Sequence, residues 1–325
     1  MSSPLPRVGI IGAGGIGKTH LRAWAANGVT PTAITDAKPE ILAEAIAAHG
    51  GQPFDSGFDL IASGTVDVVS ICTPPAFHAG LAIAALEAGV AVLCEKPLAT
   101  TVDDAERVAA VAGETGVLIA MGFCHRFQPH IEKLKAMIDE GQLGTVRGFR
   151  NRFAGHLKNA EGIWFSNPRI SGGGALIDTS VHSVDLFRYL FGDPDRVEAL
   201  TSTVATDLGP ALEVEDTGVI VLRTAAGVIG VIEASWKTPS GEWTVSVFGT
   251  GGSATVNYAD NTLRYCPAGG AWGGVEVEDG DRFVREITSF IDCWRGDQAA
   301  PRATVHDGVA ATRILANAYA SAGSA

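Results

Sequence analysis

Short apolar runs alternate with longer segments of helical composition over the first 122 residues. The apolar runs are too short for helices, and each reads as a buried strand of a sheet. We expect strands at Val8–Ile11, Thr32–Thr35, Val66–Ile71, Val90–Cys94 and Val117–Gly122. Helical composition lies between and after them, at 18–26, 39–49, 58–62, 77–88 and 103–115. This alternation predicts a doubly wound parallel sheet with helices on both faces, the Rossmann arrangement.

After a helix expected at 129–140, strand-like runs follow one another with few helices between them. Strands are expected at Val146–Phe153, Arg196–Ala205, Val214–Arg223, Val228–Trp236, Thr244–Phe248 and Ala254–Tyr258. Turn residues separate several of these runs, so the second half predicts an antiparallel sheet. One helix, preceded by Gly172–Gly174, interrupts them, and helical stretches at 282–295 and 305–320 close the chain. We therefore expect two domains, residues 1–123 and 124–325.

The amino-acid composition limits which partners the protein can bind and in which cellular compartment we expect it. The chain has 325 residues, of which 46% are hydrophobic, enough for two cores. The net charge of −12 argues against nucleic acid or an anionic membrane surface as a partner. No apolar run reaches membrane-span length, and residues 1–6 are too short and polar for a signal peptide. Five scattered cysteines without a C-x-x-C pair indicate reduced thiols in a cytoplasmic protein, with no metal site.

A glycine-rich loop joins the first strand to the first helix. It reads Gly12-Ala13-Gly14-Gly15-Ile16-Gly17. Gly12 permits a tight turn, Gly14 lets a pyrophosphate approach the backbone, and Gly17 lets helix and strand pack closely. The first amides of the helix, those of Gly15 and Ile16, would then face the phosphates. The loop predicts dinucleotide binding, and the alternative is a glycine-rich turn with no ligand.

Asp36 stands at the end of the second strand, about twenty residues beyond the glycine loop. Its carboxylate can accept hydrogen bonds from the adenosine ribose hydroxyls. Its charge disfavours a 2′-phosphate, and Ala37 offers no donor to one, although Lys38 could. We therefore favour NAD over NADP as the cofactor.

Ligands on such sheets lie at the carboxyl ends of the strands, so the residues after each strand become candidates. The stretches after the third, fourth and fifth strands are expected to gather round the nicotinamide end of the cofactor. The candidate contacts are Cys72, Thr73, Pro74, His78, Glu95 and Lys96. Taken alone, His78 could merely start the next helix, and the Glu95-Lys96-Pro97 sequence could be a surface turn.

In the second half, Asp178 and His182 are four residues apart on a predicted helix and therefore share a face. A pair at this spacing is usually a surface hydrogen bond. A hydride-transfer enzyme, however, also needs an acid/base pair, which the first domain does not offer. The three glycines before the helix suggest a hinge or a close approach of backbone or ligand.

Together these residues resemble the Gfo/Idh/MocA oxidoreductases. The resemblance rests on the glycine loop, Thr73-Pro74 with His78, Glu95-Lys96-Pro97, Arg126-Phe127, Gly172 to His182, and the closing stretch from Asp307-Gly308. It implies a nicotinamide-binding Rossmann domain followed by an α/β domain with a large, open, mostly antiparallel sheet. It also implies a homodimer or homotetramer formed through that sheet. The closely spaced Val228, Ile229, Val231 and Ile232 point the same way, because they suggest an uncovered apolar face.

The resemblance further implies that Lys96, Asp178 and His182 are catalytic. It places additional substrate contacts near Arg126, His156, Trp164 and Thr179. The implied substrate is a secondary alcohol or ketone of a sugar, an inositol or a related polyol. Two alternatives stay open: a non-sugar carbonyl or dihydrodiol on the same scaffold, and a dinucleotide-binding regulator without turnover. The regulator would be expected to lack one of the three catalytic residues.

Overall fold

The computed structural model describes residues 5–158 and 163–323. The chain forms two compact units, and we describe each by itself. Unit 1 comprises Met1–Cys124 and Asp281–Thr312, and unit 2 comprises His125–Gly280 and Arg313–Ala325. The division expected from the sequence was a single cut after residue 123, whereas the packing assigns 281–312 to unit 1. Across the described ranges, no helix combines the length and the hydropathy needed to cross a bilayer.

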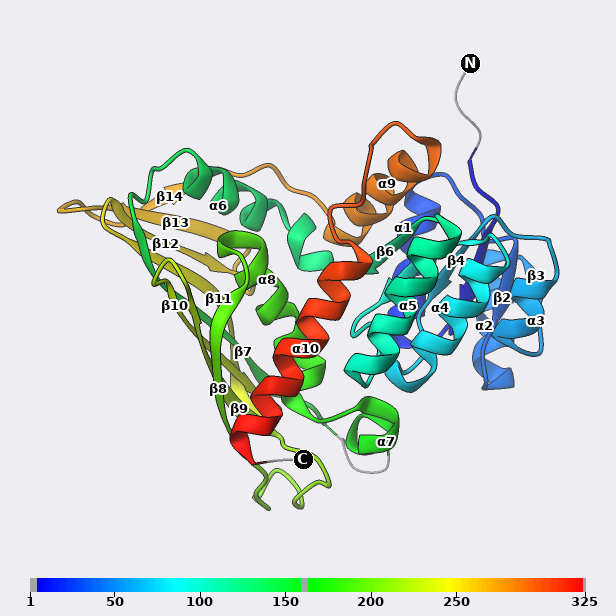
Figure 1. The fold of residues 1–325 in the computed structure, drawn as a ribbon, viewed down its shortest axis with the longest axis horizontal. Helices are drawn as coiled ribbons and strands as arrows, with labels where there is room; N and C mark the ends of the chain where they lie inside the picture. Colours follow the sequence, from blue (N-terminus) through cyan, green and yellow to red (C-terminus); the bar gives the residue numbers. More distant parts are fainter. Residues whose placement is uncertain (1–4, 159–162, 324–325) are drawn as a thin grey trace. The chain divides into compact units, whose positions relative to one another are not determined.

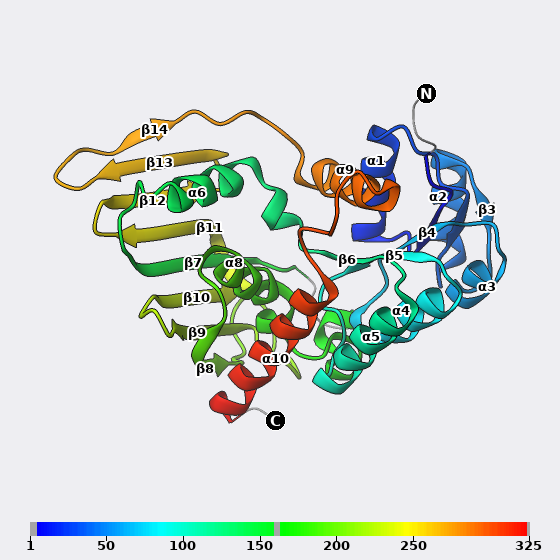
Figure 2. The same cartoon turned by 45° about the horizontal axis from the view of Figure 1, so that its top comes forward.

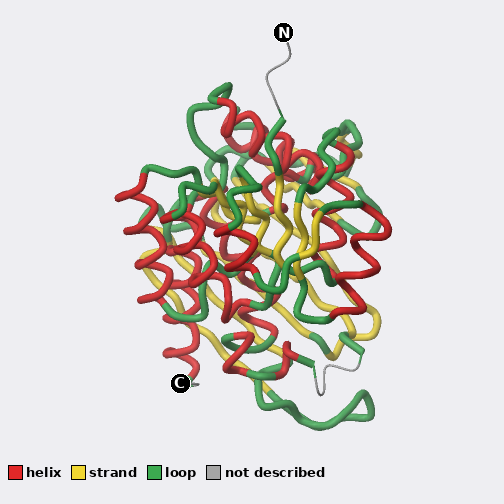
Figure 3. The backbone as a smooth tube through the Cα atoms, turned by 90° about the vertical axis from the view of Figure 1, so that its right-hand side faces the viewer, coloured by secondary structure: helices red, strands yellow, loops and turns green. Residues whose placement is uncertain are grey.

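Unit 1 is a six-stranded parallel sheet in the order β3-β2-β1-β4-β5-β6. Its strands are β1 (Val8–Ile11), β2 (Ala33–Thr35), β3 (Gln52–Pro53), β4 (Val68–Ile71), β5 (Ala91–Glu95) and β6 (Ile119–Gly122). Its helices include α1 (Gly15–Ala26), α2 (Pro39–His49), α3 (Gly57–Ala62), α4 (His78–Glu87), α5 (Val102–Thr115) and α9 (Arg282–Arg295). Figures 1 and 3 show helices on both sides of the strands, which confirms the predicted doubly wound sheet.

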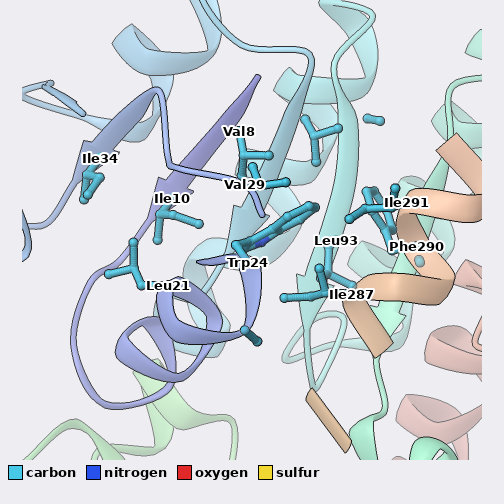
Figure 4. Close-up of a cluster of buried hydrophobic side chains, with 14 of the residues drawn as sticks. Val8, Ile10, Leu21, Trp24, Val29, Ile34, Leu93, Ile287, Phe290 and Ile291 are labelled. Carbon is cyan, nitrogen blue, oxygen red and sulfur yellow. The ribbon is translucent and has the colours of Figure 1, made fainter. Parts of the chain in front are cut away.

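The core on one face of this sheet explains why residues 281–312 belong to unit 1. Trp24 of α1 lies between β1 and helix α9, as Figure 4 shows. Its ring meets Phe290 edge-on, with 6.1 Å between the centroids. Ile287, Phe290 and Ile291 of α9 are all buried in the same cluster. Because each such side chain stabilises the fold by about 1.5–3 kcal/mol when buried, α9 is an integral part of this core.

Unit 2 contains an eight-stranded sheet in the order β14-β13-β12-β11-β7-β10-β9-β8, which Figure 2 shows. Its strands are β7 (Val146–His156), β8 (Pro194–Ser202), β9 (Thr217–Thr224), β10 (Ile229–Ser235), β11 (Lys237–Gly249), β12 (Gly252–Asn257), β13 (Thr262–Pro267) and β14 (Gly273–Val275). All neighbours are antiparallel except β7 and β10, which run parallel. The predicted open, mostly antiparallel sheet is therefore confirmed. Strands β13 and β14 were not predicted from the sequence.

Helices α6 (Pro129–Asp139) and α8 (Val181–Phe191) lie on one face of this sheet, and α7 (Pro168–Ser171) lies in the connection before α8. The covering is close: a Cβ on Gly230 of β10 would come within 2.6 Å of Phe187 of α8. Helix α10 (Val305–Ala322) contributes its residues up to Thr312 to unit 1 and the remainder to unit 2. The other face of the sheet exposes apolar side chains of β8, β9, β10 and β11.

The strand period of two corrects one detail of the sequence interpretation. Val228 and Ile232 are buried, whereas Ile229 of the same run is 51% exposed. The four closely spaced apolar residues therefore divide between the covered and the uncovered face.

Candidate functional site

The glycine loop of unit 1 begins directly after β1 and is held against the end of β4. Gly12 has φ +92°, and a Cβ there would lie 2.8 Å from the carbonyl oxygen of Cys72. A Cβ on Gly17 would lie 2.0 Å from the carbonyl oxygen of Gly12. A Cβ does not fit at either position because backbone atoms occupy the space, so both residues must be glycine.

The outer side of the same loop is open. A Cβ on Gly14 or Gly15 would have no heavy atom of the described residues within 4 Å. Within the described chain, helix α1 has no side-chain cap and no acidic residue in its first turn. Its first amides, which include that of Ile16, therefore lie where an anion can bind, and this arrangement fits a pyrophosphate.

Asp36 is fixed at the edge of this loop by two main-chain donors. The Ala13 N–H donates to Oδ2 at 2.8 Å, and the Lys38 N–H donates to Oδ1 at 2.9 Å. Each carboxylate oxygen can accept a further hydrogen bond. The side chain is thus oriented in advance and keeps capacity for the hydroxyls of a ribose.

The loop after β4 carries the next group of candidates. Burial raises the pKa of the Cys72 thiol well above its usual value, so this cysteine stays protonated. The Thr73 hydroxyl oxygen is buried and has no hydrogen-bond partner among the described residues. A buried polar atom without a partner is unusual in a folded protein and is what a bound ligand would satisfy. Pro74 directly follows it.

His78 joins this loop to the turn after β5. Its Nδ1 lies 2.7 Å from the carbonyl oxygen of Pro97, and its Nε2 lies 2.7 Å from that of Thr73. Burial lowers the pKa of His78 despite these two acceptors, so the ring is neutral and donates to one carbonyl at a time. Both ring nitrogens face the main chain, and His78 therefore holds the two loops together.

Glu95 ends β5 and is buried, with Lys96 directly after it. Burial acts to raise the pKa of Glu95, but the hydrogen bond from His20, with the nearby charge of Lys96, lowers it overall. The carboxylate is therefore ionised. Glu95 was predicted as a cofactor contact, whereas no local pattern pointed to His20 as its partner.

The candidate residues of unit 2 lie on the segment that follows Gly172–Gly174. It begins with a π-helical turn, η4 (Leu176–Ser180), and continues as α8. Asp178 lies in the π-helical turn and His182 in the first turn of α8. Sequence periodicity predicted a single regular helix here. π-Helical turns are rare and occur frequently at functional sites.

Glu215 fixes the start of this segment. Its carboxylate accepts hydrogen bonds from the Gly174 N–H at 3.0 Å, the Leu176 N–H at 2.8 Å and the Tyr319 hydroxyl at 2.7 Å. Burial raises the pKa of Glu215, and it raises that of Tyr319 as well. A Cβ on Gly174 would lie 1.9 Å from the Glu215 carbonyl oxygen, and one on Gly173 would lie 2.2 Å from the Tyr319 hydroxyl. The close approach expected from these glycines is present.

A cluster of aromatic rings in unit 2 contacts His182 through His125. The His125 ring lies with its centroid 4.4 Å from that of His182. The Nδ1 atom of His125 is 2.8 Å from the Tyr258 hydroxyl, and Phe153 packs against the His125 ring at 5.1 Å. Phe153 in turn stacks on Trp243 at 4.6 Å. His125 lies in the stretch after the fifth expected strand, which the sequence places near the nicotinamide, but neither it nor Tyr258 was singled out as a site residue. The signal for His125 was its place after β6, whereas Tyr258 offered none.

Two further predicted substrate contacts, Arg126 and Thr179, are each hydrogen-bonded to a carboxylate of unit 2. The guanidinium of Arg126 is buried and donates to both carboxylate oxygens of Asp185, at 2.9 and 2.6 Å. This ion pair orients the side chain inside unit 2. The Thr179 hydroxyl donates to Asp178 at 3.3 Å.

His156 lies at the end of β7, and the Trp164 ring stacks on Phe165 at 3.7 Å. Lys96 belongs to unit 1, whereas these residues, with Asp178 and His182, belong to unit 2. The catalytic and substrate-binding roles of all these residues stay predictions.

Two protein-family models match the chain. Residues 6–123 match the model described as the oxidoreductase family NAD-binding Rossmann fold, and residues 131–255 match the GFO/IDH/MocA C-terminal domain. The chain is 31% identical to levoglucosan dehydrogenase of Pseudarthrobacter phenanthrenivorans, over 77% of this chain and 73% of that protein. It is 30% identical to inositol 2-dehydrogenase of Rhizobium meliloti, over 95% of this chain and 94% of that one. A solved levoglucosan dehydrogenase in complex with NADH and levoglucosan superposes with a TM-score of 0.90. That structure has 27% identity and covers 98% of this chain and 97% of its own.

Proposed function

Because the chain belongs to the Gfo/Idh/MocA family of NAD-binding oxidoreductases, we propose that it transfers a hydride between NAD and a CH–OH group of a sugar, an inositol or a related polyol. The observation that carries the substrate class is the similarity to inositol 2-dehydrogenase over nearly the whole of both chains. The open glycine loop and the oriented carboxylate of Asp36 support NAD as the cofactor. A cytoplasmic location is proposed from the scattered, unpaired pattern of the cysteines.

The proposed chemistry assigns one task to each of three residues. NAD, when bound, supplies the acceptor for the hydride that leaves the carbinol carbon. His182 takes the hydroxyl proton, since an imidazole titrates in the useful range. Asp178 orients His182 and stabilises the imidazolium that forms. The Lys96 ammonium donates a hydrogen bond to the substrate oxygen and stabilises its alkoxide character as the proton leaves. In the reductive direction the same groups return the proton.

A substrate panel tests the proposal. Inositols, anhydrosugars, aldoses and keto-sugars are assayed with NAD and with NADP by following the absorbance of the reduced cofactor. A non-sugar ketone and a dihydrodiol are included as the competing substrate class. Turnover restricted to that class would redirect the proposal. NADH binding without turnover of any member would favour a non-catalytic regulator.

Cofactor preference gives the first mutational prediction. We expect Asp36→Ser combined with Ala37→Arg to move the preference from NAD toward NADP by about tenfold or more. The change removes a carboxylate beside the ribose and adds a guanidinium that can bind a 2′-phosphate. The measurement is the pair of dissociation constants for NADH and NADPH, from fluorescence titration. Glu114→Ser, which removes one exposed charge from α5, is the control. Tighter binding of NADP than of NAD by the unmodified protein would contradict the assignment.

For the quaternary structure, we propose a homodimer or homotetramer formed through the uncovered face of the unit 2 sheet. That face exposes Leu200 of β8, Val221 of β9, Ile229 of β10 and Phe248 of β11. Large exposed apolar patches are uncommon on monomers and mark association surfaces. We expect Val221→Asp with Ile229→Asp to give a monomer by light scattering, whereas Lys133→Asp on α6 leaves the mass unchanged. A monomeric unmodified protein at micromolar concentration would rule the proposal out.

A further inference from the structure

A buried histidine on helix α1 reaches the residue that precedes Lys96. The His20 side chain has no exposed surface, and its Nε2 lies 3.0 Å from Oε1 of Glu95. Its Nδ1 lies 3.3 Å from the Ser70 hydroxyl, which accepts a hydrogen bond from the Trp24 indole N–H at 2.9 Å. The second oxygen of Glu95, Oε2, accepts the main-chain N–H of Lys96 at 3.1 Å. A continuous line of contacts therefore runs from α1 to the backbone of Lys96.

The hydrogen-bond donors and acceptors among Ser70, His20 and Glu95 can all be assigned without conflict. An ionised carboxylate only accepts, so the His20 Nε2 carries the hydrogen that faces Glu95. The Ser70 hydroxyl then donates to Nδ1 when the ring is neutral, and it accepts from Nδ1 when the ring is charged. In either state His20 donates to Glu95, which is only 4% exposed. Without that donor, a buried carboxylate oxygen would lose its partner.

The surroundings leave the Glu95 carboxylate little room to turn elsewhere. A Cβ on Gly122, at the end of β6, would lie 3.0 Å from both Cδ and Oε1 of Glu95. The carboxylate therefore packs directly on bare backbone, where a glycine provides the space. Its position is set by His20 on one side and by the Lys96 N–H on the other.

We propose that His20 is a positioning residue for Lys96. It fixes the Glu95 carboxylate, which in turn fixes the main chain from which the Lys96 side chain projects. His20 and the first-turn amides that suit a pyrophosphate belong to the same helix, so the network links the cofactor loop to the lysine within unit 1. This inference rests on the proposed function, in which Lys96 acts on the substrate oxygen.

Two substitutions separate positioning from packing. In His20→Gln the side-chain amide replaces Nε2 and still donates to Glu95, whereas the shorter His20→Asn reaches only the Nδ1 side. We expect kcat to fall about 10- to 100-fold in His20→Asn and to stay within about threefold in His20→Gln, because small misplacements of a reacting group cost that much. The dissociation constant for NADH should change little in both variants. Arg22→Ala, which removes a mostly exposed side chain from the same helix and leaves the His20–Glu95 contact in place, is the matched control and should retain kcat.

A second measurement does not depend on turnover. Reductive ¹³C-methylation gives each lysine an NMR signal, and the Lys96 signal is the one absent in Lys96→Ala. It should move in His20→Asn and stay in place in His20→Gln. Equal losses of kcat in both variants, or a Lys96 signal that ignores His20, would overturn the inference. If the unmodified protein oxidises no polyol, the proposed function fails, and the NMR comparison still decides the positioning role.

Discussion

Replacing His182 by alanine is expected to lower kcat by about 10² to 10⁴, the usual contribution of a positioned general base. The variant should still fold and bind NAD, because the side chain is half-buried in unit 2 whereas the glycine loop belongs to unit 1. Steady-state kinetics and an NADH titration check the two halves of this prediction. His306→Ala, which removes an exposed histidine from α10, is the control.

The pH profile identifies the step that is lost. The acidic limb of kcat/KM reports protonation of the base in the free enzyme, so it should disappear in His182→Ala. Asp178→Asn should also be impaired, and the double variant should be far from additive because the two residues act as a unit. An acidic limb that survives unchanged in His182→Ala would assign the proton to another group, with Lys96 as the next candidate.

Lys96→Ala should lose a factor of about 10² to 10³ in kcat, comparable to the removal of one donor to a developing oxyanion. The dissociation constant for NADH should stay within a few fold, because the glycine loop and Asp36 are untouched. Stopped-flow measurement of single turnovers separates the chemical step from product release. Lys38→Ala, which removes an exposed lysine close in sequence to Asp36, is the matched control. Near-normal turnover in Lys96→Ala would remove this residue from the mechanism.

Local pattern was sufficient to predict most of the elements. Short apolar runs and a change of period predicted both sheets, because buried strands and amphipathic helices leave different spacings. Strand β3 was not predicted because its two residues, Gln52 and Pro53, are exposed and form no apolar run. The π-helical turn at Leu176–Ser180 was not predicted because the spacing of apolar residues alone does not distinguish it from a regular helix.

In the candidate site, too, the features with a local sequence pattern were predictable and those formed by distant residues were not. The glycine loop and Asp36 could be proposed as a cofactor site because the spacing of the glycines, the strand, the helix and the acid is a recognisable sequence pattern. The partners that fix the site could not, since they are far apart along the chain: His20 and Glu95 by 75 positions, and Glu215 and Tyr319 by 104. No spacing rule relates such residues, and only the folded chain brings them together.

The contribution of α9 to unit 1 has a consequence for synthesis on the ribosome. Helix α9 begins at Arg282, so the core around Trp24 lacks three buried side chains until most of the chain has been translated. At about 1.5–3 kcal/mol each, their absence is large against the marginal stability of a domain. The core of unit 1 therefore stays incomplete on the ribosome until residues 125–280, which form most of unit 2, have been translated. Chaperones that shield apolar surface would act on it during that interval.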